Sequence, residues 1–208
     1  LSPPALSIDT IERICAPSTG IYVWQERASR ALATSIEKGR MPHLVLNMAG
    51  TGAGKTRMNV RAICSLNEGT EVRLATALNL RTLALQTGDA YAEQLDIGKD
   101  ELTCVIGDKM ARELHDYQKS LSGVGEPMSD DDENPVEEDL ETVGQFEYTE
   151  APDWLRRFMR GKPNLGAVVG SPVLVSTIDF LIAAGEPHRQ GNHALAALRI
   201  MTSDLILD

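Results

Sequence analysis

The sequence predicts an α/β fold in which a parallel sheet is covered by helices on both faces. Two observations support this fold. Short, nearly continuous apolar runs alternate with amphipathic stretches, a pattern typical of buried parallel strands and of the helices that connect them. A glycine-rich segment at residues 49–56 also lies between one apolar run and one helical stretch, where the loops of such sheets bind ligands.

The first half of the chain supplies two strand–helix units after two leading helices. We expect the first helix at residues 7–15 and the second at residues 24–36, where apolar side chains recur on one face until Gly39 and Pro42 end it. Residues 44–48 are expected to form a strand and residues 57–66 a helix. A second strand at residues 72–76 and a helix at residues 80–95 follow.

The second half is interrupted by an acidic segment. A strand at residues 103–107 and a helix at residues 110–119 precede residues 121–152, which are rich in Gly, Ser, Asp, Glu and Pro and are expected to form a flexible insertion. A short helix at residues 154–159 closes the insertion. A strand at 173–177, helices at 178–184 and 192–198, and a strand at 204–207 complete the pattern.

The charge of the chain is concentrated in one place. The net charge of −10 argues against nucleic acid as a partner, but residues 126–153 hold twelve acidic residues and no Lys or Arg. The rest of the chain then has 18 acidic and 20 basic residues, which permits a local basic groove. The run Asp130 to Glu133 could bind cations or mimic nucleic acid, although a solvated loop is the simpler interpretation.

The three cysteines and the apolar runs indicate the compartment. Cys15, Cys64 and Cys104 are odd in number, far apart in the sequence and free of any Cys-x-x-Cys spacing, so we expect neither a disulfide framework nor a structural zinc site. No apolar run approaches the roughly 20 residues that span a bilayer, and the N-terminus lacks a signal sequence. A reducing cytoplasm fits both observations.

Residues 49–56, Ala-Gly-Thr-Gly-Ala-Gly-Lys-Thr, have the pattern of a phosphate-binding loop of the Walker A type. Glycines let backbone N–H groups turn toward an anion, and the following helix presents its N-terminus to the same phosphates. Lys55 could reach the terminal phosphates, and the Thr56 hydroxyl could ligate Mg²⁺. The candidate phosphate-binding residues are Gly50, Thr51, Gly52, Ala53, Gly54, Lys55 and Thr56.

These residues and three later segments resemble the motifs of superfamily 2 helicases. Residues 49–56 resemble motif I, residues 75–83 motif Ia, residues 175–181 a later strand-contacting motif, and residues 205–208 the start of motif II. The resemblance covers residues 22–208 and implies the first RecA-like lobe of such an enzyme, with residues 1–20 as a lead-in. The expected fold is therefore a RecA-like P-loop fold.

Three phrases are similar to one branch of that superfamily, the CRISPR-associated helicase-nucleases of type I systems, subtype F. They lie at residues 48–56, 176–181 and 203–208. The resemblance implies a 3′→5′ translocase on single-stranded DNA that is driven by ATP with Mg²⁺. It also implies recruitment by an RNA-guided surveillance complex, a second RecA-like lobe and a metal-dependent nuclease domain in the same protein, and anti-CRISPR inhibitors as further candidate partners.

The resemblance assigns roles at the nucleotide site. Asp208 matches the Walker B aspartate, which positions Mg²⁺ opposite Thr56 while Lys55 acts on the phosphates; the alternative is an acidic residue that merely ends a strand. Gln25 resembles a glutamine that reads the adenine edge in many relatives. It could equally be a solvated residue beside Trp24, which begins the apolar face of its helix.

The strand-contacting motifs contain the candidate nucleic-acid ligands. Their side chains can donate hydrogen bonds to phosphate oxygens and so position a strand without reading its bases. For Thr177, helix capping is the competing explanation. The candidates are Asn79, Arg81, Thr82, Ser176 and Thr177.

Other functions remain open at this stage. A different P-loop enzyme such as a nucleotide kinase would explain residues 49–56 but not the ordered motifs after them, and a non-catalytic nucleotide-binding module is also possible. His115-Asp116 is not expected to form a binuclear metal site, because the four histidines do not cluster with acidic residues at ligand spacing.

The ends of the sequence suggest a piece of a larger protein. The chain begins at Leu1 without a methionine and stops at Asp208, immediately after an apolar run. Hydrolysis in this class needs an arginine from a second lobe, so we expect these residues alone to hydrolyse ATP poorly.

Overall fold

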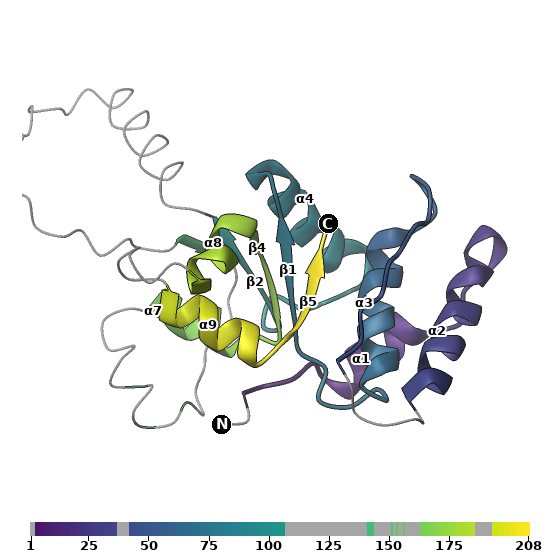
Figure 1. The fold of residues 1–208 in the computed structure, drawn as a ribbon, viewed down its shortest axis with the longest axis horizontal. Coiled ribbons are helices and arrows are strands. Elements are labelled where there is room, and N and C mark those ends of the chain that lie inside the picture. The colour runs from purple at the N-terminus through teal and green to yellow at the C-terminus, as the bar shows by residue number, and fades with distance from the viewer. Residues whose placement is uncertain are drawn as a thin grey trace, which may run out of the picture.

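A computed structural model describes residues 3–36, 42–106, 141–143, 151, 153, 156, 163–185 and 193–208. Within these residues, one sheet has the strand order β3-β2-β4-β1-β5 (Figure 1). The strands β1, β2, β4 and β5 are parallel, and β3 pairs antiparallel with β2. The strands are β1 (Leu74–Leu78), β2 (Leu102–Ile106), β3 (Glu141–Val143), β4 (Val173–Thr177) and β5 (Asp204–Leu207). The predicted α/β fold with a parallel sheet is confirmed.

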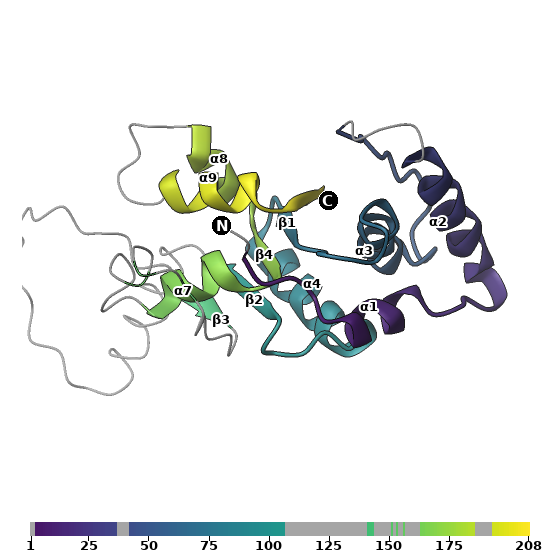
Figure 2. The ribbon, with the colours of Figure 1, turned by 90° about the horizontal axis from the view of Figure 1, so that it is seen from below.

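Helices cover both faces of this sheet, as the sequence predicts. One face carries α1 (Ile8–Cys15), α3 (Lys55–Leu66) and α4 (Arg81–Gln94), and the opposite face carries α7 (Pro163–Gly170), α8 (Ile178–Ile182) and α9 (His193–Met201). Figure 2 shows the sheet between α4 and α9. The helix α2 (Val23–Ile36) packs against α3, and the 3₁₀ turns are η1 (Gly20–Tyr22) and η2 (Ala183–Gly185).

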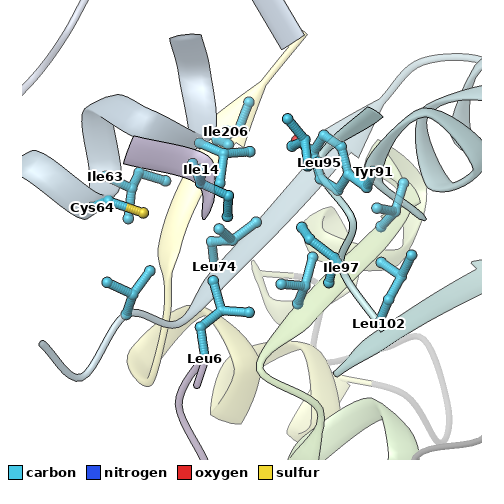
Figure 3. Close-up of a cluster of buried hydrophobic side chains, with 14 of the residues drawn as sticks. Leu6, Ile14, Ile63, Cys64, Leu74, Tyr91, Leu95, Ile97, Leu102 and Ile206 are labelled. Atoms are coloured by element: carbon cyan, nitrogen blue, oxygen red, sulfur yellow. The ribbon is translucent and has the colours of Figure 1, made fainter. Parts of the chain in front are cut away.

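Alternation along the strands divides the core into two apolar clusters. On β1, Leu74 and Leu78 face the cluster that contains α1, α3 and α4, whereas Ala75 and Ala77 face the cluster of α7, α8 and α9. Figure 3 shows the first cluster, where residues from α1, α3 and α4 converge on Leu74. A parallel sheet needs such cover on both faces because its strands are apolar on both sides.

The described part of the lead-in segment belongs to the first cluster. Ser7 caps α1 through its side chain, and Glu101 at the start of β2 accepts hydrogen bonds from the Ser7 amide (2.6 Å) and the Thr10 hydroxyl (2.7 Å). Ile11 and Ile14 of α1 are buried against the sheet. The helix predicted at residues 7–15 is confirmed, and it packs on the same core as the strands.

The predicted strand at residues 44–48 is wrong in this structure. The segment has no regular structure, and Leu44, Leu46 and Met48 are 87%, 76% and 91% exposed. The reason is the lack of a paired neighbour: β5 is the edge strand on this side, and a cavity lies between β5 and the segment. A strand draws its hydrogen bonds from neighbouring strands, so an apolar run without one stays extended and irregular.

Most of the predicted acidic insertion, residues 121–152, lies outside the described residues. The helix predicted at residues 110–119 also lies outside them, and so does most of the helix predicted at residues 154–159. Near the end of the insertion, β3 pairs with β2 and Ala151 is fully buried in the second cluster. These residues therefore contribute to the folded core. The helix α7 is an addition that the sequence analysis did not predict.

Two buried arginines hold the turn that precedes β4. Arg199 of α9, which is fully buried, donates to the carbonyls of Ser171 (2.5 Å), Leu74 (2.5 Å) and Pro172 (3.0 Å). Arg73 donates to the carbonyls of Gly170 and Ser171, both at 2.8 Å. Burial, and then the nearby charge of Arg73, lower the pKa of Arg199 well below its usual value.

Replacing Arg199 with Met should loosen the contact between α9, β4 and β1. Buried carbonyls then lose their donor, and we expect a local loss of about 2 kcal/mol, because relief of the buried charge offsets part of the cost. Hydrogen–deuterium exchange of peptides from β4 and α9 would report this loss as faster opening. The control is Arg30→Met on the exposed face of α2, where the ion pair with Glu26 contributes little. Equal exchange in the two variants would contradict the account.

Candidate nucleotide-binding site

The glycine-rich loop turns sharply before it enters α3. Gly52 and Gly54 have φ values of 78° and 77°, in the left-handed region that glycine adopts without strain. The Ala53 amide donates to the Gly50 carbonyl (3.2 Å), and the Met58 amide donates to the Gly54 carbonyl (3.1 Å) as α3 begins at Lys55. The first turn of α3 has no acidic side chain, so its N-terminal N–H groups are free of a competing carboxylate.

Two asparagines fix the entry to the loop, and the sequence analysis missed both. Asn47 donates from Nδ2 to Oδ1 of Asn59 on α3 (2.7 Å), and its own Oδ1 accepts from the Ala49 amide (3.2 Å). This second bond is a local turn of the kind that asparagine favours. In the sequence, Asn47 lies two residues before the loop, and this position could have indicated the turn.

Gln25 and Tyr22 brace the other end of the loop. The Gln25 side chain is 1% exposed, and its Nε2 donates to the carbonyls of Gly54 (3.0 Å) and Ala53 (3.4 Å). A Cβ at Gly54 would lie 2.6 Å from Gln25 Nε2 and 3.0 Å from the Tyr22 ring. Gln25 is therefore not solvated, and its buried Oε1 finds no hydrogen-bond partner among the residues that the structure describes.

Lys55 and Asp208 line the same cavity. This cavity, of about 1290 Å³, lies between α2, residues 43–50, α3 and β5. Gly50 and Ala53 of the loop border it, and its remaining wall is largely apolar, including the face of α2 that carries Trp24. The cavity is larger than a typical small-molecule site of roughly 300–1000 Å³, so a nucleotide would occupy only part of it.

The parallel register explains how Asp208 reaches this place. Ala77 of β1 pairs with Leu207 of β5, and the Asp208 amide donates to the Ala77 carbonyl (3.1 Å). Asp208 thus follows the carboxyl end of β5, as in sheets that bind ligands there. The Asp208 charge also affects Tyr91. Burial raises the pKa of the Tyr91 hydroxyl, the hydrogen bond with Thr76 (2.9 Å) lowers this pKa, and the Asp208 carboxylate raises it.

The donor set fits a nucleotide phosphate with Mg²⁺. Phosphate oxygens are suited by the Lys55 ammonium, by the N-terminus of α3, whose first turn has no acidic residue, and by the left-handed glycines of the loop. The Thr56 hydroxyl and the Asp208 carboxylate are oxygen ligands of the kind that Mg²⁺ prefers. Among the described residues, no group of three or more His, Cys, Asp or Glu side chains could hold a metal ion by itself. His115 and Asp116 lie outside these residues.

The candidate nucleic-acid ligands separate into exposed and buried residues. Asn79 and Thr82 are exposed and Arg81 is half-buried, all at or just after the carboxyl end of β1. Ser176 is fully buried within β4, and Thr177 is 5% exposed. Thr177 stands at the N-cap position of α8, as the capping interpretation predicts, but its side chain makes no capping hydrogen bond.

The carboxyl ends of β1, β4 and β5 lie on one edge of the sheet. Leu78 pairs with Thr177, and Ala77 pairs with both Ser176 and Leu207. The segments after these strands, which carry Asn79 and Asp208 among others, therefore emerge side by side. The candidate strand-contacting residues and Asp208 therefore lie at one edge of the sheet, where parallel sheets commonly bind ligands.

Two curated proteins are similar in sequence to most of the chain. It is 36% identical over 200 residues to the CRISPR-associated nuclease/helicase Cas3 of subtype I-F/YPEST from Pectobacterium atrosepticum. It is also 36% identical over 192 residues to the protein of the same description from Pseudomonas aeruginosa. The chain is related to the CRISPR-associated nuclease/helicases of subtype I-F.

Each match covers 90% of this chain and 17% of the relative. No protein-family model matches the chain. The chain therefore spans about one sixth of the length of the two nuclease/helicases that it matches. None of the described helices has the length and apolarity that crossing a membrane requires.

Proposed function

We propose that residues 21–208 are the first RecA-like lobe of an ATP-dependent 3′→5′ translocase on single-stranded DNA that acts in CRISPR interference. In the full protein this motor is coupled to a metal-dependent DNA nuclease. The observation that carries the proposal is the cavity that Lys55 of the phosphate-binding loop shares with Asp208 at the end of β5. The printed names of the relatives, which are nuclease/helicases, support the same activity class.

In this proposal the loop holds the phosphates of ATP. The backbone N–H groups of Gly50, Thr51, Gly52 and Gly54 and the N-terminus of α3 would surround the phosphate oxygens, and Lys55 would compensate their charge; the Ala53 amide could join them only by giving up its bond to the Gly50 carbonyl. Thr56 and Asp208 hold the Mg²⁺ that accompanies the nucleotide. ATP supplies the free energy for movement, and the chain orients its terminal phosphate within a partly apolar cavity.

Gln25 remains the candidate adenine contact, and its position gives it a second role in holding the glycine-rich loop. Its buried amide holds the carbonyls of Ala53 and Gly54, so it fixes the conformation of the loop. The unpartnered Oε1 is the atom left for a further donor. An exocyclic amine of adenine is a donor of the required kind, and reaching it requires Oε1 to become accessible.

DNA would lie along the edge of the sheet where β1 and β4 end. Arg81 can donate to phosphate oxygens from the first residue of α4, and Asn79 and Thr82 can add hydrogen bonds from exposed positions. Ser176 and Thr177 are covered in this structure, so they would contact a strand only after a local opening at the end of β4. The backbone of a single strand is the expected ligand, without readout of its bases.

The partners follow from the same proposal. A second RecA-like lobe supplies the arginine that completes hydrolysis, and the nuclease domain cuts the strand that the motor delivers. An RNA-guided surveillance complex recruits the enzyme to its DNA, and anti-CRISPR inhibitors are candidate ligands of the same protein.

The test is to measure phosphate release from ATP by the full-length protein with and without single-stranded DNA. We expect strong stimulation by DNA and no transfer of phosphate to nucleoside monophosphates. Hydrolysis that ignores DNA, together with phosphotransfer to a monophosphate, would replace the motor with a nucleotide kinase. The absence of any ATP turnover would favour a non-catalytic binding module.

A further inference from the structure

Two cysteines that are 49 residues apart in the sequence meet in the structure. Cys15 is the last residue of α1, and Cys64 lies on the third turn of α3. Cys64 belongs to the first apolar cluster, Cys15 packs against that cluster, and the two thiols are close enough to influence each other's ionisation. Cys64 is 1% exposed, whereas Cys15 is half-buried and open to small reagents. In Figure 3, Ile14 of α1 lies beside Ile63 and Cys64 of α3.

Two arginines of α3 hold the chain on both sides of Cys15. Arg57 donates to the carbonyls of Arg13 (3.0 Å) and Ile14 (3.1 Å), and Arg61 donates to the Ala16 carbonyl (3.1 Å). A further bond joins Arg61 to the Ser18 hydroxyl at 2.9 Å. Because the backbone is held before and after Cys15, this residue stays against the helix that carries Cys64 while α1 is docked.

The same surroundings make the two thiols unequal. The hydrogen bond from Cys64, followed by the charges of Arg61 and Arg57, lowers the pKa of Cys15 to about 7 in spite of its partial burial. The shared hydrogen bond and burial raise the pKa of Cys64, which keeps its proton. Thiolate is the reactive form of cysteine, so Cys15 is the attacking group and Cys64 the resolving one.

We propose that Cys15 and Cys64 are a redox modification site that closes to a disulfide when it meets a low-molecular-weight disulfide such as glutathione disulfide. The Cys15 thiolate attacks one sulfur of glutathione disulfide, forms a mixed disulfide and releases one glutathione thiolate. Cys64 then loses its proton to solvent and attacks the Cys15 sulfur, which releases the second glutathione. The two cysteines give up two electrons, and glutathione disulfide is reduced to two thiols.

The cross-link would join α1 to the helix that carries the phosphate-binding loop. α3 begins at Lys55, and Cys64 lies nine residues further along the same helix. A bond between α1 and α3 constrains the unfolded chain and restricts movement of α3 against the sheet. Under reducing conditions the pair rests as two thiols, which agrees with the compartment that the sequence suggests.

Trypsin separates the three cysteines, so peptide mapping tests the proposal in the full-length protein. Cys15 falls on residues 14–27, Cys64 on residues 62–73 and Cys104 on residues 100–109. After treatment with glutathione disulfide and blocking with N-ethylmaleimide, we expect the first two peptides to be joined and the third to be alkylated. The joined peptide should disappear on reduction with dithiothreitol. Two separate, alkylated peptides would overturn the proposal.

The Cys64→Ala variant tests the division of roles. We expect a stable glutathione adduct on Cys15, since no resolving thiol remains, whereas the control Cys104→Ser still closes the disulfide. The rate of Cys15 alkylation by iodoacetamide should be half-maximal near pH 7 in the parent protein. In Cys64→Ala the midpoint should rise toward the ordinary value of about 8.5, because the donor is lost. An unchanged midpoint would contradict the pairing.

Discussion

Replacing Lys55 with Ala in the full-length protein is expected to abolish the proposed ATP-driven unwinding of DNA and to spare the proposed metal-dependent nicking of single strands. Lys55 is the first residue of α3 and lines the cavity that Asp208 shares, and it is the one cationic side chain of residues 49–56. Losing a charge that stabilises the transferring phosphoryl group should lower ATP hydrolysis about 100-fold or more. The nuclease is expected to use other residues and therefore to keep its activity.

The measurement pairs a strand-separation assay with a nicking assay on the same preparation. Lys99→Ala is the matched control, because Lys99 is an exposed lysine in the segment before β2 and does not line the cavity. It should retain both activities. If Lys55→Ala unwinds DNA at the rate of the parent protein, Lys55 has no part in the motor.

Replacing Gly54 with Ala is expected to disable the loop by a different route. Gly54 has a φ of 77°, and a side chain in that conformation costs about 1–2 kcal/mol. Its Cβ would also lie 2.6 Å from Gln25 Nε2 and 3.0 Å from the Tyr22 ring. Either the buried Gln25 side chain must then give up its bonds to the loop or the loop must change conformation, and we expect ATP affinity to fall about tenfold or more.

Two neighbouring glycines separate strain from steric clash. Gly52 has a φ of 78° but open space around it, so Gly52→Ala carries strain alone. Gly50 has open space and no positive φ, so Gly50→Ala carries neither cost. We expect thermal stability to fall in the order Gly50→Ala, Gly52→Ala, Gly54→Ala, with the last variant least stable. Equal melting temperatures for the three variants would refute the role assigned to Gln25 and Tyr22.

Local sequence patterns were sufficient for much of the fold. The apolar runs of β1, β2, β4 and β5 and the periodic helices beside them predict a parallel sheet, because each pattern depends on residues that are close in sequence. In the structure, the strand order places Asp208 at the cavity that Lys55 lines. From the sequence, this proximity could be expected only from the resemblance to helicase motifs.

The remaining features depend on neighbours that the sequence does not reveal. An apolar run at residues 44–48 has the composition of a strand, but pairing decides whether it becomes one, and here it faces a cavity. Cys15 and Cys64 meet only because α1 docks on α3. Gln25 holds the phosphate-binding loop through two backbone carbonyls, a contact that no side-chain pattern records.

The central claim, that the loop and Asp208 together hold Mg²⁺ and ATP, is tested most directly by equilibrium binding. The affinity of the full-length protein for a slowly hydrolysed ATP analogue is measured with and without Mg²⁺, in the parent protein and in Lys55→Ala and Asp208→Asn. The account predicts that Mg²⁺ tightens binding in the parent protein, that Lys55→Ala weakens binding in both conditions, and that Asp208→Asn removes most of the effect of Mg²⁺. Equal affinities in all three proteins, with the same dependence on Mg²⁺, would contradict it.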